Sequence, residues 1–313
     1  MPISRAYRRT RISPTPSGFL HLGNAASFVL TAGLARRHGA SILLRIDDMD
    51  RDRVRPEYVR DIFDTLQFLG IPWDEGPTDA ADFDREYSQL HRMDRYLKSL
   101  SALEDAGVIF ACTCSRSELS RLAAENPNPC TCFHASMSLA APGAGWRLLT
   151  QTDTPIHMRD ISENRMSYTL PSSMRHFLVR KKDGYPSYQL TSVVDDIHFG
   201  VDLVVRGEDL FDSTLAQLHL SDMLGDNDFQ RTAFFHHPLL LGSMGEKLSK
   251  SDGATSVRFM RKTGAKPADI FRHIAASFAI DGAPETWEAL FTLLVPTLGS
   301  DGRLSPGVVP VSW

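Results

Sequence analysis

The chain has 313 residues, of which 42% are hydrophobic and 23% charged, and its formal net charge is −4. This composition excludes a disordered or fibrous chain, and the acidic balance argues against a protein that coats nucleic acid without sequence preference, because that mode needs excess Lys and Arg. No stretch approaches the roughly 18 apolar residues of a membrane span, and residues 1–10 lack the apolar segment of a secretory signal. We therefore expect a cytoplasmic, enzyme-sized protein without membrane contact.

The beginning of the chain alternates between strand and helix patterns. The predicted elements are a strand at 10–13, a Pro- and Gly-rich loop at 14–24, a helix at 25–37, a buried parallel strand at 41–46 and a helix at 56–69. Pro56 suits the first helical position and Gly70 suits a helix end. The alternation predicts an α/β fold, a doubly wound parallel sheet of the Rossmann type, with ligands at the carboxyl ends of its strands.

The middle of the chain is more varied. A helix is predicted over 85–106, with its apolar stripe formed by Leu90, Met93, Leu97, Leu100 and Leu103. The further predicted elements are a strand at 108–114, a helix opened by the capping box of Ser115 and Glu118, an irregular loop at 123–145, a hairpin of 176–180 and 185–190 around Asp183 and Gly184, a strand at 202–207, and helices and turns after Ser256.

These patterns predict four consecutive parts. They are the first half of a catalytic domain at 1–107, an inserted α+β subdomain at 108–180, the second half of the catalytic domain at 181–255, and a short helical C-terminal region at 256–313.

The loop before the first predicted helix suits the phosphates of a nucleotide. Gly18 and Gly23 let the backbone approach a ligand closely, and the helix that follows directs its free N–H groups and positive dipole end toward an anion. His21 can donate a hydrogen bond to phosphate there.

A second loop, GEKLSKSDG at 245–253, carries two lysines three residues apart. The ammonium groups of Lys247 and Lys250 can follow charge that develops on a polyphosphate. Taken alone, each loop is also compatible with a solvated surface.

Together the two loops resemble the signatures of a class I aminoacyl-tRNA synthetase. RISPTPSGFLHLGNA is similar to the glutamyl and glutaminyl form of the first signature, with HLGN at 21–24 in place of His-Ile-Gly-His, and KLSKS at 247–251 is similar to Lys-Met-Ser-Lys-Ser. Two further segments resemble glutamyl-type enzymes: LRIDDMDRDRVRPEYVRDIFDTLQFLGIPWDEGP and YPSYQLTSVVDDIHFGVDLVVRGEDLFDST. The resemblance covers residues 11–253.

The resemblance implies ATP-dependent activation of glutamate, with Mg²⁺ on the ATP phosphates, followed by transfer to an acceptor. The implied catalytic residues are His21, Lys247 and Lys250. The implied ATP-binding residues are Gly18, His21, Gly23, Asn24, Lys247, Ser249 and Lys250.

A glutamate site needs cations for two carboxylates and an anion for the amino group. The resemblance implies that these contacts come from Arg11, Thr15, Asp47, Tyr188 and Arg206. Two positions depart from the family pattern. Asp47 replaces the usual Glu and is shorter by roughly one C–C bond, about 1.5 Å, and Ser192 stands where discriminating glutamyl enzymes often have Asn. Both departures leave the choice of amino acid open.

All four cysteines, Cys112, Cys114, Cys130 and Cys132, lie in two C-x-C pairs within one short segment. Because cytosolic disulfides are uncommon, the alternatives are a Zn²⁺ site and buried thiols, and the clustering favours Zn²⁺. The resemblance also implies zinc in this insertion. Since the second pair often includes Tyr in the family, one of Cys130 and Cys132 could be replaced as a ligand by His134.

The expected acceptor follows from the length of the chain. Only 62 residues follow Ser251, too few for the large anticodon-binding domain of a glutamyl-tRNA synthetase. The chain therefore resembles the short branch of the family, which places glutamate on queuosine in the anticodon loop of tRNA(Asp). The alternative is a glutamyl-type adenylate-forming enzyme with another RNA or a small molecule as acceptor. We expect a monomer.

Overall fold

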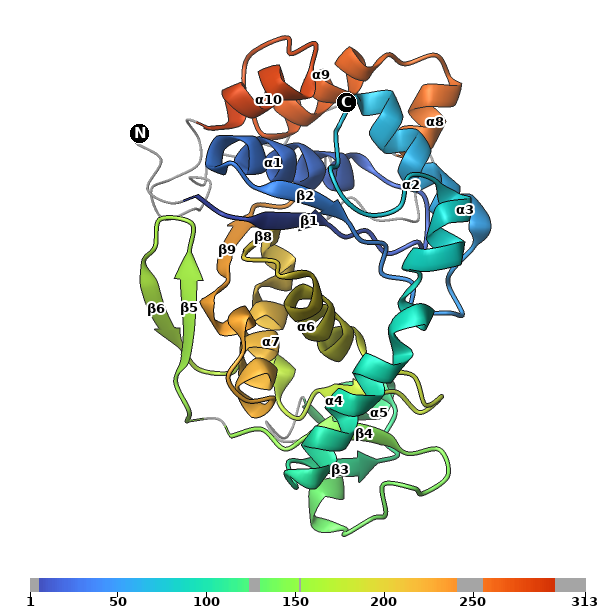
Figure 1. Cartoon of the computed structure of the whole chain (residues 1–313), viewed down its shortest axis with the longest axis vertical. Coiled ribbons are helices and arrows are strands. Elements are labelled where there is room, and N and C mark those ends of the chain that lie inside the picture. Colours follow the sequence, from blue (N-terminus) through green and yellow to red (C-terminus); the bar gives the residue numbers. More distant parts are fainter. Residues whose placement is uncertain (1–5, 124–129, 152, 241–255, 296–313) are drawn as a thin grey trace.

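The computed structural model describes residues 6–123, 130–151, 153–240 and 256–295 (Figure 1). The strands in these ranges are β1 (Arg9–Ile12), β2 (Ser41–Leu44), β3 (Ile109–Cys112), β4 (Gly145–Leu148), β5 (Ile156–Asp160), β6 (Arg165–Tyr168), β7 (Leu178–Arg180), β8 (Leu203–Gly207) and β9 (Ala233–His237). The α-helices are α1 (Leu22–His38), α2 (Pro56–Leu69), α3 (Ala80–Asp82), α4 (Met93–Asp105), α5 (Arg116–Ala123), α6 (Tyr188–Phe199), α7 (Phe211–Met223), α8 (Val257–Lys262), α9 (Pro267–Ser277) and α10 (Trp287–Leu294).

Parallel strands form the centre of the molecule. β1 pairs with β2, and β9 pairs with β8 on one side and β5 on the other, all in parallel. The N–H of Asp202, just before β8, donates to the carbonyl of Arg9 in β1, which joins the two groups of strands. β6 pairs antiparallel with β5 at the outer edge. The α/β parallel sheet expected from the sequence is confirmed.

Helices cover both faces of this sheet. In Figure 1, α1, α9 and α10 lie on one face and α6 and α7 on the other. Each face has its own apolar core. The first contains Leu30, Ile42 and Phe271, and the second contains Leu190 and Leu218, all at most 2% exposed. The doubly wound arrangement is therefore correct.

The two ends of α2 follow the sequence signals. The helix begins at Pro56, and Gly70 ends it with a φ of 65°, a conformation that glycine adopts without strain. In contrast, α1 begins at Leu22, three residues before the prediction, because His21 caps it.

The single helix expected over 85–106 is wrong, because the chain is extended at Ser88, with a ψ of 142°. The Ser88 hydroxyl and the Gln89 N–H both donate to the carboxylate of Asp48, which holds the break in place. The regular helix α4 starts only at Met93. Consequently the predicted apolar stripe is only partly buried, and Leu97 is 49% exposed.

The expected hairpin at 176–190 is half correct. The chain turns at Gly184, whose φ is 90°, but its second arm is helical rather than extended. The Ser187 hydroxyl accepts from the N–H of Leu190 and caps α6, which therefore begins at Tyr188.

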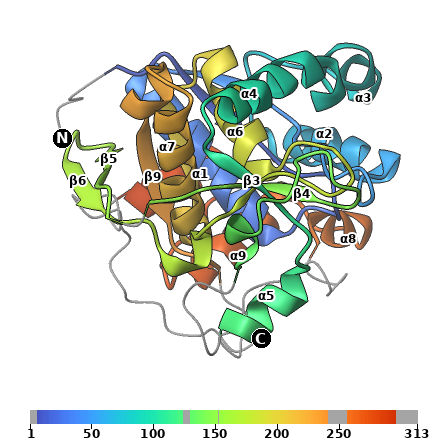
Figure 2. The ribbon, with the colours of Figure 1, turned by 90° about the horizontal axis from the view of Figure 1, so that it is seen from below.

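The segment expected as an insertion divides between two sheets. β3, β4 and β7 form a separate antiparallel sheet, whereas the β5–β6 hairpin joins the central sheet through β9. Seen from below, this hairpin lies at one edge of the molecule and α2 and α3 lie at the opposite edge (Figure 2). The separate part is therefore smaller than residues 108–180. Among the described residues, no helix is long and apolar enough to cross a membrane.

Candidate functional site

A cavity of about 330 Å³ lies where β1 and β8 end and α1 begins. The expected site residues that line it are Arg11, Thr15, Gly18, His21, Gly23, Asn24, Tyr188 and Arg206. The structure thus brings together residues from both halves of the predicted catalytic domain. Parallel strands ending at a helix N-terminus suit an anionic ligand.

The N-terminus of α1 is held by its own side chains. Nδ1 of His21 accepts from the N–H of Gly23 at 3.1 Å, and the Asn24 side-chain oxygen accepts from the N–H of His21 at 3.1 Å. The loop before it is anchored by Asp61, whose buried carboxylate accepts from the N–H of Leu20 at 3.2 Å. This capping orients the imidazole at the end of the helix, beside the cavity.

The second phosphate loop, with Lys247, Ser249 and Lys250, lies outside the described residues. The chain on either side of it is described, and both sides reach the cavity. Leu240 lines the cavity, and Ser256 forms a β-bridge with His21.

Two buried guanidinium groups face the cavity. Arg11 is 4% exposed, donates to the carbonyl of Val205 at 3.2 Å and lies 3.4 Å from the carboxylate of Asp196. Arg206 is 5% exposed and donates to the Gln217 side-chain oxygen at 2.9 Å. Its Nε and one terminal nitrogen have no hydrogen-bond partner in the described part of the chain. Burial lowers the pKa of Arg206 to about 10, so the group keeps its charge at neutral pH.

A larger groove, of about 1160 Å³, adjoins the cavity. Thr15 and Tyr188 line both spaces, so the two meet at these residues. The groove extends to Cys112 and Cys114. Its basic lining residues are Arg147, Arg175, Lys181 and Lys182. Sequence reasoning missed these cations, although the KKDG turn at 181–184 was a signal.

Asp47 lines the groove rather than the cavity. Its carboxylate is 6% exposed and accepts from Arg45 at both oxygens, at 2.7 and 3.1 Å. Burial raises the pKa of Asp47 despite this ion pair. Ser192 is buried on α6 and lines neither space. The structure therefore places neither of these two departures from the family pattern among the residues that line the cavity.

A buried ionic network, which sequence reasoning missed, supports the site. Arg45 bonds Asp196 at 2.6 Å, and Arg92 bonds both oxygens of Asp195 at 2.8 and 3.0 Å. The hydroxyl of Tyr96 donates to Asp195 at 2.7 Å. Because buried charges need partners, this network fixes β2, α4 and α6 relative to one another.

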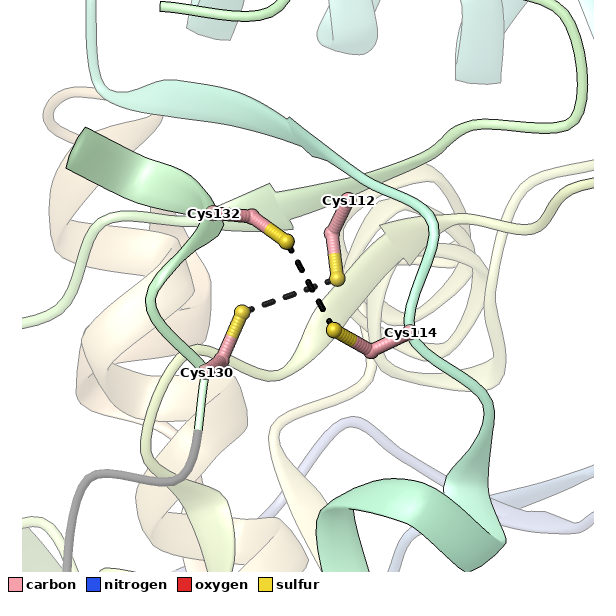
Figure 3. A group of neighbouring side chains, drawn as sticks. All are labelled: Cys112, Cys114, Cys130 and Cys132. Carbon is pink, nitrogen blue, oxygen red and sulfur yellow. Dashed lines mark hydrogen bonds between the residues drawn. The ribbon is translucent and has the colours of Figure 1, made fainter. Parts of the chain in front are cut away.

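The four cysteines converge beside β3 (Figure 3). The Sγ atoms of Cys112 and Cys130 are 3.6 Å apart, those of Cys114 and Cys132 are 3.5 Å apart, and all four lie within 4.8 Å of one another. Four thiolates around Zn²⁺ at about 2.3 Å would be about 3.8 Å apart, so the residues fit a tetrahedral zinc ion. His134 is not part of this group and packs on the Phe133 ring.

The environment of Cys112 favours a thiolate. Hydrogen bonds from Cys130 and Arg147 lower the pKa of Cys112, although its burial acts in the opposite direction. In the same group, burial raises the pKa of Cys114 and the hydrogen bond with Cys112 raises the pKa of Cys130, so a bound cation is needed to hold these two as thiolates.

The sheet, the helix N-terminus and the buried cations define the class of α/β nucleotide-binding enzymes that act on anionic substrates. The description "tRNA synthetases class I (E and Q), catalytic domain" matches residues 8–286. The chain belongs to this family and is an ATP-dependent ligase.

Individual relatives agree with this assignment. The chain is 36% identical over 287 residues to the glutamyl-Q tRNA(Asp) synthetase of Nitratidesulfovibrio vulgaris. This match covers 85% of this chain and 85% of that protein. The chain is also 36% identical over 274 residues to the glutamate–tRNA ligase of Thermosynechococcus vestitus, covering 82% of this chain and 54% of the relative. The chain thus spans about half the length of that ligase.

A solved structure shows the same fold. The glutamate tRNA ligase of Elizabethkingia meningosepticum, in complex with its amino acid, superimposes with a TM-score of 0.69 at 22% identity. The match covers 96% of this chain and 67% of that one.

Proposed function

We propose that this chain activates glutamate with ATP and transfers it to queuosine in the anticodon loop of tRNA(Asp). The observation that carries the proposal is the junction at Thr15 and Tyr188, where a cavity with two buried cations meets a basic groove. The cavity suits the small reactants, and the groove suits a polyanionic acceptor.

In the activation step, the α-carboxylate of glutamate attacks the α-phosphorus of ATP, and pyrophosphate leaves. Arg11 and Arg206 would bind the carboxylates of glutamate, since both are buried cations at the cavity. His21 and the N-terminus of α1 would contact the phosphates, with Lys247 and Lys250 following the charge on the departing pyrophosphate. Mg²⁺ bound with ATP would neutralise phosphate charge. Catalysis in this scheme is positioning and charge stabilisation, without a covalent enzyme intermediate.

In the transfer step, a hydroxyl of the acceptor attacks the activated carbonyl, and AMP leaves. The attack requires the acceptor to reach the junction at Thr15 and Tyr188. The cations of the groove would bind phosphates along that route, which fixes position without reading sequence.

The share of each relative that the match covers favours queuosine over the 3′-terminal ribose as the acceptor. The match covers 85% and 88% of two proteins named glutamyl-Q tRNA(Asp) synthetase, and the shared region therefore includes most of their length. In the glutamate–tRNA ligase of T. vestitus it covers 54%.

Zinc is part of the proposal. Cys112, Cys114, Cys130 and Cys132 would hold it as four thiolates, and it would supply a structural cross-link between β3 and the segment that contains the second pair. Because two of these cysteines line the groove, the metal would shape the route of the acceptor.

Transfer of labelled glutamate tests the proposal. The enzyme is incubated with ATP, Mg²⁺ and either tRNA(Asp) that carries queuosine or the same tRNA from cells unable to make it. We expect label only on the queuosine form, and none on tRNA(Glu). Equal labelling of both forms, or labelling of tRNA(Glu), would contradict queuosine as acceptor. In the accompanying ATP–pyrophosphate exchange, a faster rate with aspartate or glutamine than with glutamate would contradict glutamate as the amino-acid substrate.

A further inference from the structure

His237 is a cavity residue without an assigned role. It is the last residue of β9, is 4% exposed, and lines the same cavity as His21 and Arg206. Side chains alternate along a strand, so His237 shares a face with Phe235, which packs in the core that contains α1. His237 therefore lies on the α1 face of the sheet.

The hydrogen bond at one ring nitrogen defines the role of the other. Nδ1 of His237 lies 2.9 Å from the carbonyl oxygen of Pro238. A carbonyl oxygen only accepts, so Nδ1 carries the proton. Burial lowers the pKa of His237 more than Pro238 and the charge of Asp209 raise it, so the ring is neutral at pH 7. Nε2 is then a hydrogen-bond acceptor.

This acceptor is buried and unsatisfied. Among the described residues, Nε2 of His237 has no hydrogen-bond partner. An unpaired buried acceptor costs about 1–3 kcal/mol, so a ligand that donates to it would be selected over one that does not. The required ligand atom is an N–H or O–H donor.

The two faces of the sheet indicate which reactant Nε2 of His237 contacts. In β8, Arg206 bonds Gln217 of α7 and therefore points to the α7 face, whereas Val205 packs in the core on the α1 face, and the alternation of the strand places position 207 on that same face. Gly207 is the register partner of His237. The guanidinium that suits a carboxylate thus lies on one face, and His237 lies on the other, with the N-terminus of α1 that suits phosphates.

We propose that Nε2 of His237 accepts a hydrogen bond from the adenosine moiety of ATP and makes the cavity selective for this nucleotide. The inference rests on the proposed function, which places ATP in this cavity. The donor is either the exocyclic amino group of adenine or a ribose hydroxyl, which share the required N–H or O–H chemistry.

The test compares the wild type with His237→Leu and His237→Gln. ATP–pyrophosphate exchange is measured with ATP, inosine triphosphate, 2′-deoxy-ATP and 3′-deoxy-ATP. We expect His237→Leu to raise the KM for ATP about 5- to 100-fold with little change in the KM for glutamate. The variant should also lose discrimination against one analogue. Loss against inosine triphosphate identifies the adenine amino group, and loss against a deoxy analogue identifies the ribose. His237→Gln, which retains an acceptor oxygen, should recover part of the affinity.

Unchanged KM for ATP and unchanged discrimination in a folded His237→Leu variant would overturn the inference. Equal increases in both KM values, with no change in discrimination, would also overturn it, because they indicate a purely structural role. If His237→Leu does not fold, the same criteria apply to His237→Gln, for which a smaller shift is expected. Direct calorimetric binding of ATP separates the two proposals: wild-type binding that His237→Leu weakens supports the contact even if glutamate-dependent exchange is absent.

Discussion

The cavity and the groove differ in how they present positive charge. In the cavity, Arg11 and Arg206 are at most 5% exposed and held by Val205 and Gln217. In the groove, Lys182 is exposed and donates to the carbonyl of Thr113, although Arg147 in the same lining is buried. Fixed, buried cations suit recognition of a small substrate, because its carboxylates must fit their geometry. An exposed lysine such as Lys182 suits a long polyanion, because it attracts phosphates without demanding one arrangement.

The two regions also differ in the elements that build them. The cavity lies at the ends of the central parallel strands, covered by helices on both faces, whereas the groove reaches a small antiparallel sheet and two of the four clustered cysteines (Figures 1 and 3). We therefore expect changes in the cavity to stop activation and, with it, transfer. Changes in the groove should affect transfer alone.

Breaking the network between the two regions should have the largest effect. Asp195→Asn leaves Arg92 without its buried counter-charge and removes one of the three carboxylates around Arg45, and loss of one partner from a buried pair costs about 3–5 kcal/mol of stability. Chemical denaturation measures this, with Asp94→Asn, exposed on α4, as the control. A loss no larger than that of the control would contradict the structural role of the network.

The same variant has a predicted pH dependence. Burial alone would raise the pKa of Asp195, but its bonds with Arg92 and the charges of Arg45 and Arg92 outweigh burial and lower the pKa. A lowered pKa contributes stability above the unfolded value near 3.9, and this contribution is lost as pH falls through the folded value. The stability difference between wild type and Asp195→Asn should therefore shrink below about pH 4. A constant difference would contradict this assignment.

The next largest effect is expected in the second phosphate loop. Lys250→Ala should lower ATP–pyrophosphate exchange about 10²- to 10³-fold, because a group that stabilises developing charge is removed. Transfer should fall equally, since it depends on activation. Lys98→Ala, an exposed lysine outside both spaces, is the control. Near-normal exchange by Lys250→Ala would remove this loop from the mechanism.

Removal of metal should separate the two regions. We expect about one zinc per chain by elemental analysis, and its chelation should reduce transfer about 10- to 100-fold while exchange continues. Added zinc should restore transfer. Absence of zinc, or four freely titratable thiols in the native protein, would contradict the metal site.

The smallest effect is expected from charge in the groove. The double variant Lys181→Ala/Lys182→Ala should lower kcat/KM for tRNA about tenfold, as two contacts of about 0.7 kcal/mol each would, with exchange unchanged. Its transfer should also depend less on salt, because fewer phosphates are neutralised. Parallel losses in exchange and transfer would show that the groove is not a separate acceptor route.

The sequence predicted the features that depend on local signals. Pro56 and Gly70 bound α2, Ser115 and Glu118 form the expected capping box, and the spacing of the cysteines indicated their cluster. These signals lie within a few residues of the structure that they determine.

Features that depend on distant partners were missed. The break at Ser88 needs Asp48, 40 residues away, and the ion pair of Arg92 with Asp195 spans 103 residues. No local pattern identifies such pairs, because each residue alone resembles a solvated polar group. The start of α6 was missed for another reason: apolar spacing beyond Ser187 is helical, but the turn signal of Asp183 and Gly184 predicts a second strand over the same residues.

The position of glutamate on the RNA is the most direct test of the proposed function. tRNA(Asp) is labelled with glutamate by the wild-type enzyme, and its 3′-terminal nucleotides are then removed with a nuclease under conditions that preserve the ester. We expect the label to remain with the body of the tRNA, because the acceptor is queuosine in the anticodon loop. Release of the label with the 3′-terminal adenosine would contradict the proposal and show ordinary aminoacylation.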